Sequence, residues 1–220
     1  MTDGPVVLVR GESLQEVPPE IARFGVTVMA RERDRQTTLA RLTERAAAVR
    51  ALIDGYGDVI ERRETGALNV WPDYKKPGMK VVAYQGTVST TVTVVDFTLV
   101  GELMLRLADH DQTTVAGPWW QIRPDSPVHR EARRAAISAA IARAREYAEA
   151  VGARVTGLLE INDVGTGPQP IMAMAASFRG RGGEEAGPQL DLDPQVQTVH
   201  ASVEARFAIS EPTVLAEPAG

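Results

Sequence analysis

Apolar and polar residues alternate along several stretches of the chain, with the period of two that is typical of a half-buried β-strand. The clearest stretch is Lys80–Val95, where valines alternate with threonines, and β-branched side chains of this kind favour a sheet. A second stretch, Val59–Val70, precedes it, and the turn-rich segment Trp71–Gly78 separates the two. This pattern predicts a long β-hairpin with a broad tip. Shorter runs predict five further strands, at Val6–Arg10, Ile21–Ala30, Val115–Arg123, Arg154–Val164 and Gln195–Ile209.

Three other stretches place their apolar residues at helical spacing. In Arg35–Asp54 the apolar positions repeat every three or four residues, and Gly55 follows as a residue that can adopt the left-handed conformation of a C-terminal cap. A second helix is predicted over Asp96–His110, with its first residue as the cap. The third, Ser126–Val151, opens with a serine cap followed by proline. Its apolar residues are mostly alanine, so another element can approach its backbone closely.

These elements predict an α+β fold, in which an antiparallel sheet with a long β-hairpin packs against about three helices. We expect residues 1–210 to form a single domain with a flexible Gly- and Pro-rich loop at about 165–194, and residues 211–220 to be a disordered tail. The most apolar long stretch, Val81–Val100, contains too many polar residues to span a bilayer. No membrane span is therefore expected.

The composition narrows the classes of function. The chain has 220 residues, 44% of them hydrophobic, which is enough to bury a core. Its net charge of −5 provides no basic field that would attract a nucleic acid, so no nucleic-acid partner is expected. Cysteine is absent, which excludes disulfides, thiolate metal sites and thiol catalysis. Residues 1–11 lack the charged and apolar regions of a signal peptide, and on that ground we expect a cytoplasmic protein.

No combination of residues predicts catalysis or a cofactor. The three histidines, His110, His129 and His200, lie in different elements without the paired spacing of metal ligands, so no metal is expected. No serine lies in a Gly-x-Ser-x-Gly turn, and the glycines of residues 180–183 lack the Gly-Lys-Ser/Thr ending of a phosphate-binding loop. A carboxylate pair brought together by folding stays open, although acidic residues such as Glu64 are more simply explained by pairing with neighbouring arginines. We therefore expect a protein that is not an enzyme.

Four aromatic residues are candidates for an interface. Trp71 and Tyr74 lie in the predicted hairpin tip, where large side chains either fold back on their own domain or contact another chain. Trp119 and Trp120 are adjacent in a predicted strand, so alternation sends their indoles to opposite faces of the sheet. One of this pair is expected in the core, and the other must be covered by a helix, a loop or a subunit.

The order of these elements and several motifs resemble the SIMPL-domain family. The motifs are Gly11-Glu12-Ser13 before a strand, Leu68-x-x-x-Pro72-x-Tyr74, the Tyr84 strand, Glu131-Ala132-Arg133 in the alanine-rich helix, and the closing strand Val199–Phe207. The resemblance extends over about residues 5–210. It implies an antiparallel sheet beside helices in bacterial proteins that are mostly exported and linked to stress defence, some of which assemble into rings. It implies no catalytic residue.

Two functions from different classes remain. The first is a non-enzymatic homo-oligomeric scaffold with a stress-related role, in which sheet edges and the candidate aromatic residues contact other subunits. The second is a binding module that holds a small apolar ligand or a peptide in the groove between sheet and helices, with residues 165–194 as a lid. Exposed indoles at a subunit contact would favour the first function, and a deep apolar pocket would favour the second.

Overall fold

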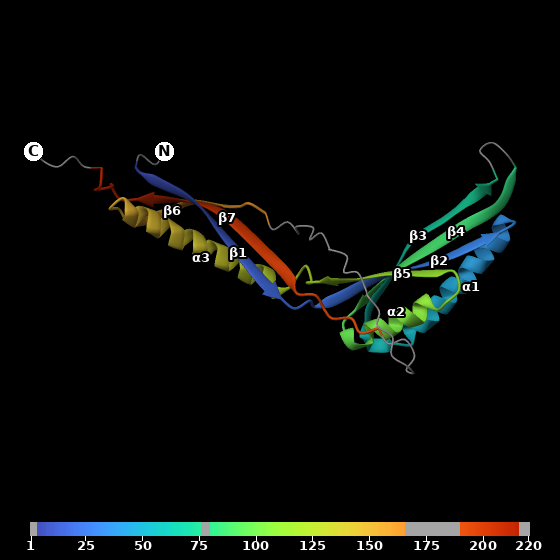
Figure 1. Cartoon of the computed structure of the whole chain (residues 1–220). Coiled ribbons are helices and arrows are strands. Elements are labelled where there is room, and N and C mark those ends of the chain that lie inside the picture. Colours follow the sequence, from blue (N-terminus) through green and yellow to red (C-terminus); the bar gives the residue numbers. More distant parts are fainter. Residues whose placement is uncertain (1–3, 76–79, 166–189, 216–220) are drawn as a thin grey trace, which may run out of the picture. The chain divides into compact units, whose positions relative to one another are not determined.

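The computed structural model describes residues 4–75, 80–165 and 190–215. In these residues the chain forms three α-helices and seven strands, which confirms the predicted α+β class (Figure 1). The strands make two antiparallel sheets rather than the one expected from the sequence. The chain divides into two compact units, each with one sheet and its own helices.

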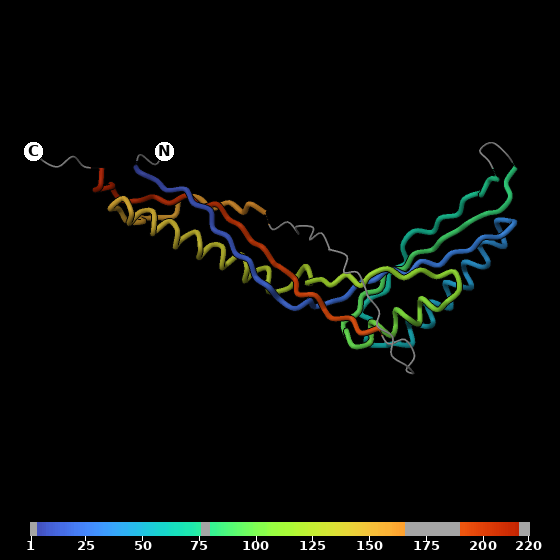
Figure 2. The backbone as a smooth tube through the Cα atoms, viewed as in Figure 1, coloured from blue at the N-terminus to red at the C-terminus, as the bar shows by residue number. Residues whose placement is uncertain are grey.

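Unit 1 comprises residues 1–17, 124–179 and 197–220. Its sheet has the order β1-β7-β6 and is formed by β1 (Val6–Val17), β7 (Gln197–Ile209) and β6 (Val155–Asp163). The helix α3 (Pro127–Ala150) lies along β1 and β7 (Figure 2). β1 is seven residues longer than predicted, because the chain continues through Gly11 as a strand. Its pairing with β7 runs without a break in register.

The helix of unit 1 packs on its sheet through a stripe of alanines at every fourth position, all 0% exposed: Ala132, Ala136, Ala140, Ala144 and Ala148. Side chains at this spacing form one ridge of an α-helix. Gly11 of β1 lies against the ridge. A Cβ atom at this glycine would overlap the carbonyl oxygen of Ala136 and lie 2.5 Å from the backbone nitrogen of Ala140. The close approach predicted from the alanine-rich sequence is therefore confirmed.

Unit 2 comprises residues 18–123 and 180–196. Its sheet has the order β3-β4-β2-β5, with β3 (Ile60–Tyr74), β4 (Val81–Val94), β2 (Ile21–Glu32) and β5 (Thr113–Gln121). The helices α1 (Arg35–Asp54) and α2 (Val100–Ala108) pack on one face of the sheet around a core of large side chains that includes Phe24, Leu42, Ile53, Leu103, Leu107 and Trp120. Residues 190–196 run beside α2, where Gly101 lies directly against the carbonyl group of Leu190 (Figure 2).

The predicted helix caps are present. Asp34 accepts a hydrogen bond of 2.8 Å from the backbone nitrogen of Thr37 at the start of α1. Ser126 caps α3, and Asp96 caps a short 3-10 turn, Phe97–Leu99, which leads into α2. The left-handed conformation expected at Gly55 is wrong: its φ is −65°, and its amide closes the last turn of α1 by a right-handed path.

Two predicted segments are covered only in part by the structure. The predicted flexible loop lies mostly outside the described residues, which exclude 166–189, but Leu192 packs against the core of unit 2. In the predicted tail, the Thr213 hydroxyl donates a hydrogen bond of 3.1 Å to the Gly152 carbonyl oxygen, while residues 216–220 are not described. Across the described parts of the chain, no helix is long and apolar enough to cross a membrane.

Candidate functional site

The sheet of unit 2 has one covered face and one open face. Side chains alternate along a strand, so residues next to the core residues Ala22 and Phe24 point away from α1 and α2. We call this second side the open face. Neither α1 nor α2 packs on it, because both helices contribute to the core on the other side of the sheet.

One row of neighbouring side chains crosses all four strands on the open face. Cross-strand pairing places Arg23 of β2 between Trp119 of β5 and Thr93 of β4, and Thr93 is in turn the partner of Arg62 of β3. Directly paired side chains on one face lie about 5 Å apart at Cβ. We call these four residues the arginine row. It contains an indole, a guanidinium, a hydroxyl and a second guanidinium in that order.

The polar groups of the arginine row are incompletely paired. The Glu64 carboxylate lies 3.5 Å from Nη2 of Arg23 and 3.4 Å from Nε of Arg62, and both distances exceed those of a strong hydrogen bond. Within the described residues, Nε of Arg23 and Oγ1 of Thr93 are buried without a hydrogen-bond partner. Thr93 is only 1% exposed, although it lies on the open face of the sheet. The row therefore contains two buried polar atoms whose hydrogen-bonding capacity is unused.

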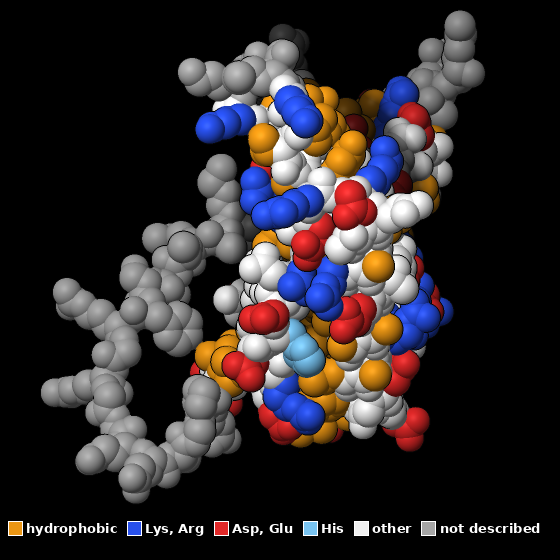
Figure 3. Space-filling model, turned by 90° about the vertical axis from the view of Figure 1, so that its right-hand side faces the viewer, with side chains coloured by type: hydrophobic (Ala, Val, Ile, Leu, Met, Phe, Trp, Pro, Cys, Tyr) orange, Lys and Arg blue, Asp and Glu red, His pale blue; other side chains and the backbone are white. Residues whose placement is uncertain are grey.

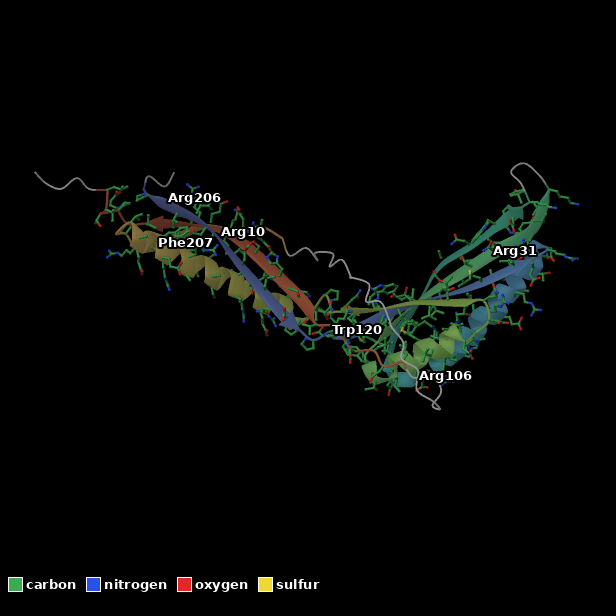
Figure 4. All side chains as sticks on the ribbon, viewed as in Figure 1. Arg10, Arg31, Arg106, Trp120, Arg206 and Phe207 are labelled. Carbon is green, nitrogen blue, oxygen red and sulfur yellow. The ribbon has the colours of Figure 1, made fainter. Side chains whose placement is uncertain are left out.

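The adjacent tryptophans point to opposite faces, as predicted from alternation. Trp120 is 8% exposed and meets Phe97 edge-to-face at 4.9 Å between ring centroids (Figure 4). Trp119 is 51% exposed, and its indole lies over Gly25, 3.8 Å from the position a Cβ would occupy. Trp120 is thus the member of the pair in the core, which removes it from the surface candidates.

The hairpin tip extends past the rest of its sheet. The last pair between β2 and β4 is Glu32 with Tyr84, whereas β3 and β4 continue to Tyr74 opposite Val81. Trp71 is 41% exposed and Tyr74 is 48% exposed in this ribbon. Neither aromatic side chain is buried on its own unit. The remaining tip residues, 76–79, are outside the described part of the chain.

A third arginine on the open face, near the tip, donates to a carboxylate at short distance. Nε and Nη2 of Arg31 (Figure 4) both donate to Oδ2 of Asp73, at 2.9 and 2.7 Å. This pair links β2 to β3 across β4, beside Trp71. It is the arrangement of an arginine with a matched carboxylate, which the arginine row lacks.

The groups whose pKa values are perturbed have structural explanations. Hydrogen bonds from the hydroxyl and amide of Thr37 lower the pKa of Asp34, and those from Thr98 lower the pKa of Asp96. Burial and a hydrogen bond of 2.9 Å to Glu102 raise the pKa of Tyr56, so this phenol stays protonated at neutral pH. These groups cap helices or join the turn at Gly57–Val59 to α2.

The described residues offer no cluster of metal ligands and one small cavity beside α1. These contain no group of three or more His, Asp or Glu side chains placed to hold a metal ion, and His110, His129 and His200 lie in or beside separate elements. A cavity between α1 and the β3–β4 hairpin has a volume of about 40 Å³ and is bordered by Ala46, Val49 and Val88. Sites for drug-sized ligands measure about 300–1,000 Å³. This cavity is too small for the ligand that the second predicted function requires.

Charges of both signs share the surface of the molecule. On the face shown in Figure 3, basic and acidic side chains are interspersed with apolar ones, and neither sign forms a continuous field. On that face, the described side chains form no basic stripe of the kind that binds a nucleic-acid backbone.

A comparison with family models decides the classification. The model described as SIMPL, protein of unknown function (DUF541), matches residues 7–207. The chain belongs to the SIMPL family. The resemblance seen in the sequence motifs is thereby confirmed, and the family description assigns no enzymatic activity.

Two named relatives of this SIMPL protein correct one expectation. It is similar to the 26 kDa periplasmic immunogenic proteins of Brucella melitensis biotype 1 and Brucella abortus, each 27% identical over 194 residues that cover 81% of this chain and 75% of the relative. Both relatives are named as periplasmic, so the cytoplasmic prediction is wrong. That prediction depended on the composition of residues 1–11, which carries no information about the compartment of related proteins.

The arginine row of this SIMPL protein was not among the sequence candidates, apart from Trp119. Its residues come from four strands whose pairing is fixed only by the folded sheet. A partial signal was present: Arg23 and Thr93 both occupy the polar positions of alternating strands. Alternation shows that such residues avoid the core, but it does not show that they meet.

Proposed function

We propose that this SIMPL protein is a periplasmic, non-enzymatic protein that assembles into homo-oligomers, with the tip of the β3–β4 hairpin as a subunit contact. The exposure of Trp71 and Tyr74 in this ribbon supports the proposal. A two-stranded ribbon alone is at best marginally stable in water, and large aromatic side chains gain stability when a neighbour covers them. Trp119 is a further candidate contact.

The other parts of the proposal have separate support. The names of the Brucella relatives support the periplasmic location. The structural explanations of the perturbed pKa values support a role without catalysis, because active sites commonly hold groups whose pKa is shifted for a chemical task. The family resemblance further implies a stress-related role for the assembly.

Light scattering of the purified full-length protein across a hundredfold range of concentration tests the proposal. We expect a mass several times 23.7 kDa that persists on dilution. Trp71→Ser combined with Tyr74→Ser should lower that mass at the dilute end, because it removes the aromatic contact area of the tip. Tyr147→Ser is the matched control, since Tyr147 is 53% exposed on α3 and should leave the mass unchanged.

Two results would contradict the proposal. A persistent monomer of the unmodified protein would exclude the homo-oligomer. An oligomer that withstands the double substitution would exclude the hairpin tip as the contact. A large loss of thermal stability in the dilute double variant would instead identify Trp71 and Tyr74 as residues that stabilise the subunit itself.

A further inference from the structure

The arginine row has features that assembly through the hairpin tip does not explain. A buried polar atom without a hydrogen bond destabilises the fold, and the row contains two such atoms, Nε of Arg23 and Oγ1 of Thr93. They belong to directly paired residues on neighbouring strands. Both donors therefore lie close to one point of the open face.

The charge of the row is unbalanced at the same point. Arg23 and Arg62 contribute two positive charges, and Glu64, the acidic partner they share, contributes one negative charge. A guanidinium has five N–H donors, and charge-assisted hydrogen bonds are about 2.7–2.9 Å long. One carboxylate at 3.4–3.5 Å does not satisfy two such groups. The row thus retains a net positive charge and unused donors.

The exposed indole supplies an apolar surface beside these donors. Trp119 is the direct partner of Arg23 across the β2–β5 ladder. Because Gly25 has no side chain, one side of the indole lies over the sheet, and half of the residue stays exposed. A compact ring with an apolar face can pack on such an indole while a charged substituent extends toward the neighbouring guanidinium.

We propose that the arginine row binds an oxyanion, a carboxylate or a phosphate, carried by a compact ring. The oxyanion lies between Arg23 and Arg62 and accepts from the exposed N–H groups of these two side chains, whose exposed fractions are 34% and 59%, and the ring packs on Trp119. Guanidinium groups match the geometry of carboxylates and phosphates. Arg31, at the other end of the same face, differs from the arginine row because its Nε and Nη2 already donate to Asp73 at 2.9 and 2.7 Å.

The ligand chemistry is tested by titrating the full-length protein with D-glucuronate and with D-glucose 6-phosphate, at constant ionic strength, by calorimetry and tryptophan fluorescence. We expect saturable binding of at least one of these probes, and their relative affinities distinguish a carboxylate from a phosphate. D-Glucose should bind at least tenfold more weakly because it lacks the oxyanion. Acetate and inorganic phosphate should bind at least tenfold more weakly because they lack the ring.

Substitutions then test the assigned residues. Arg23→Gln should weaken binding of the ring-bearing oxyanion at least tenfold. Thr93→Val is the control: it should leave the affinity unchanged and the melting temperature of the free protein unchanged or higher, since it removes a buried hydroxyl that has no partner and that a ligand does not reach.

Two acidic residues of the open face, Glu64 and Asp73, provide a matched pair of substitutions. Glu64→Gln removes the carboxylate that competes for the two arginines and should tighten binding severalfold. Asp73→Asn makes the same change of charge on the same face and should leave the affinity unchanged. Equal effects of the two substitutions would reduce the binding to overall charge and overturn the proposal. Absence of saturable binding, equal binding of D-glucose, or full affinity in Arg23→Gln would overturn it as well.

Discussion

The two units pack their helices on an antiparallel sheet in different ways. In unit 1, the fully buried side chains of α3 are all alanines, and Gly11 lets the backbones of α3 and β1 approach. In unit 2, α1 and α2 stand away from the sheet on large side chains such as Leu42, Leu103 and Leu107. Close approach of the two backbones therefore stabilises unit 1, whereas the packing of large side chains stabilises unit 2.

This difference determines where each unit is sensitive to substitution. A site of close approach has no space for an added methyl group, whereas a core of large side chains contains irregular gaps that can accept one. The cavity of about 40 Å³ beside Ala46 is such a gap in unit 2. The same type of substitution should thus have different consequences in the two units.

The largest effect is expected for Gly11→Val. The new side chain would overlap the backbone of α3 at Ala136 and Ala140, so the helix or the strand must move. We expect a loss of at least about 3 kcal/mol in the free energy of unfolding, measured by urea denaturation. Gly157→Val in β6 is the control, because a Cβ at that position meets nothing within 4 Å. Equal losses in both variants would show that close approach is not what holds unit 1.

An intermediate effect is expected for a matched pair of helix substitutions. Ala140→Val should cost about 1–3 kcal/mol, since Ala140 is fully buried against Gly11. Ala46→Val should stay within about 0.5 kcal/mol of the parent, because filling the cavity offsets the lower helix propensity of valine. Urea denaturation of the two variants gives the difference directly. A larger loss at Ala46 than at Ala140 would reverse the comparison.

The smallest effect concerns acid, because the helix caps of the two units differ in chemistry. The pKa values of Asp34 and Asp96 in unit 2 are lowered in the folded state, so their stabilisation is present above the ordinary aspartate pKa of about 3.9 and is lost as pH falls through the folded values. Ser126 of unit 1 does not titrate. Amide exchange protection at Thr37 and Thr98 should decrease below about pH 4, while protection at Val128 persists.

Two comparisons check the acid prediction. Asp34→Asn keeps a capping oxygen without a titrating group, so the loss at Thr37 should disappear in this variant. Simultaneous loss of protection at Val128 would mean that acid unfolds the whole chain and that the caps are not the cause.

Local signals were sufficient to predict the elements. Helix α1 was located at its observed bounds because its apolar spacing and polar flanks are encoded within 20 residues. The extent of β1 was missed because Gly11 resembles a strand breaker, and its actual role, contact with α3, depends on residues more than 100 positions away. The division into two sheets was missed for the same reason, since β1 pairs with the last strand of the chain.

The candidate surfaces were predictable to different degrees. Alternation alone placed Trp119 and Trp120 on opposite faces, because that property is local to one strand. The exposure of Trp71 could not be derived, because it depends on where β2 ends beside the hairpin. The arginine row could not be predicted from the sequence, because its residues meet only through the register of three separate strand pairs.

The position of β7 has a consequence for the order in which the chain can fold during synthesis. β7 is the central strand of its sheet, yet it is the last strand to leave the ribosome. The two outer strands, β1 and β6, have no partner in that sheet until residues 197–209 emerge. A nascent chain can thus form nearly all of unit 2 while β1 has no strand partner, until β7 has been synthesised.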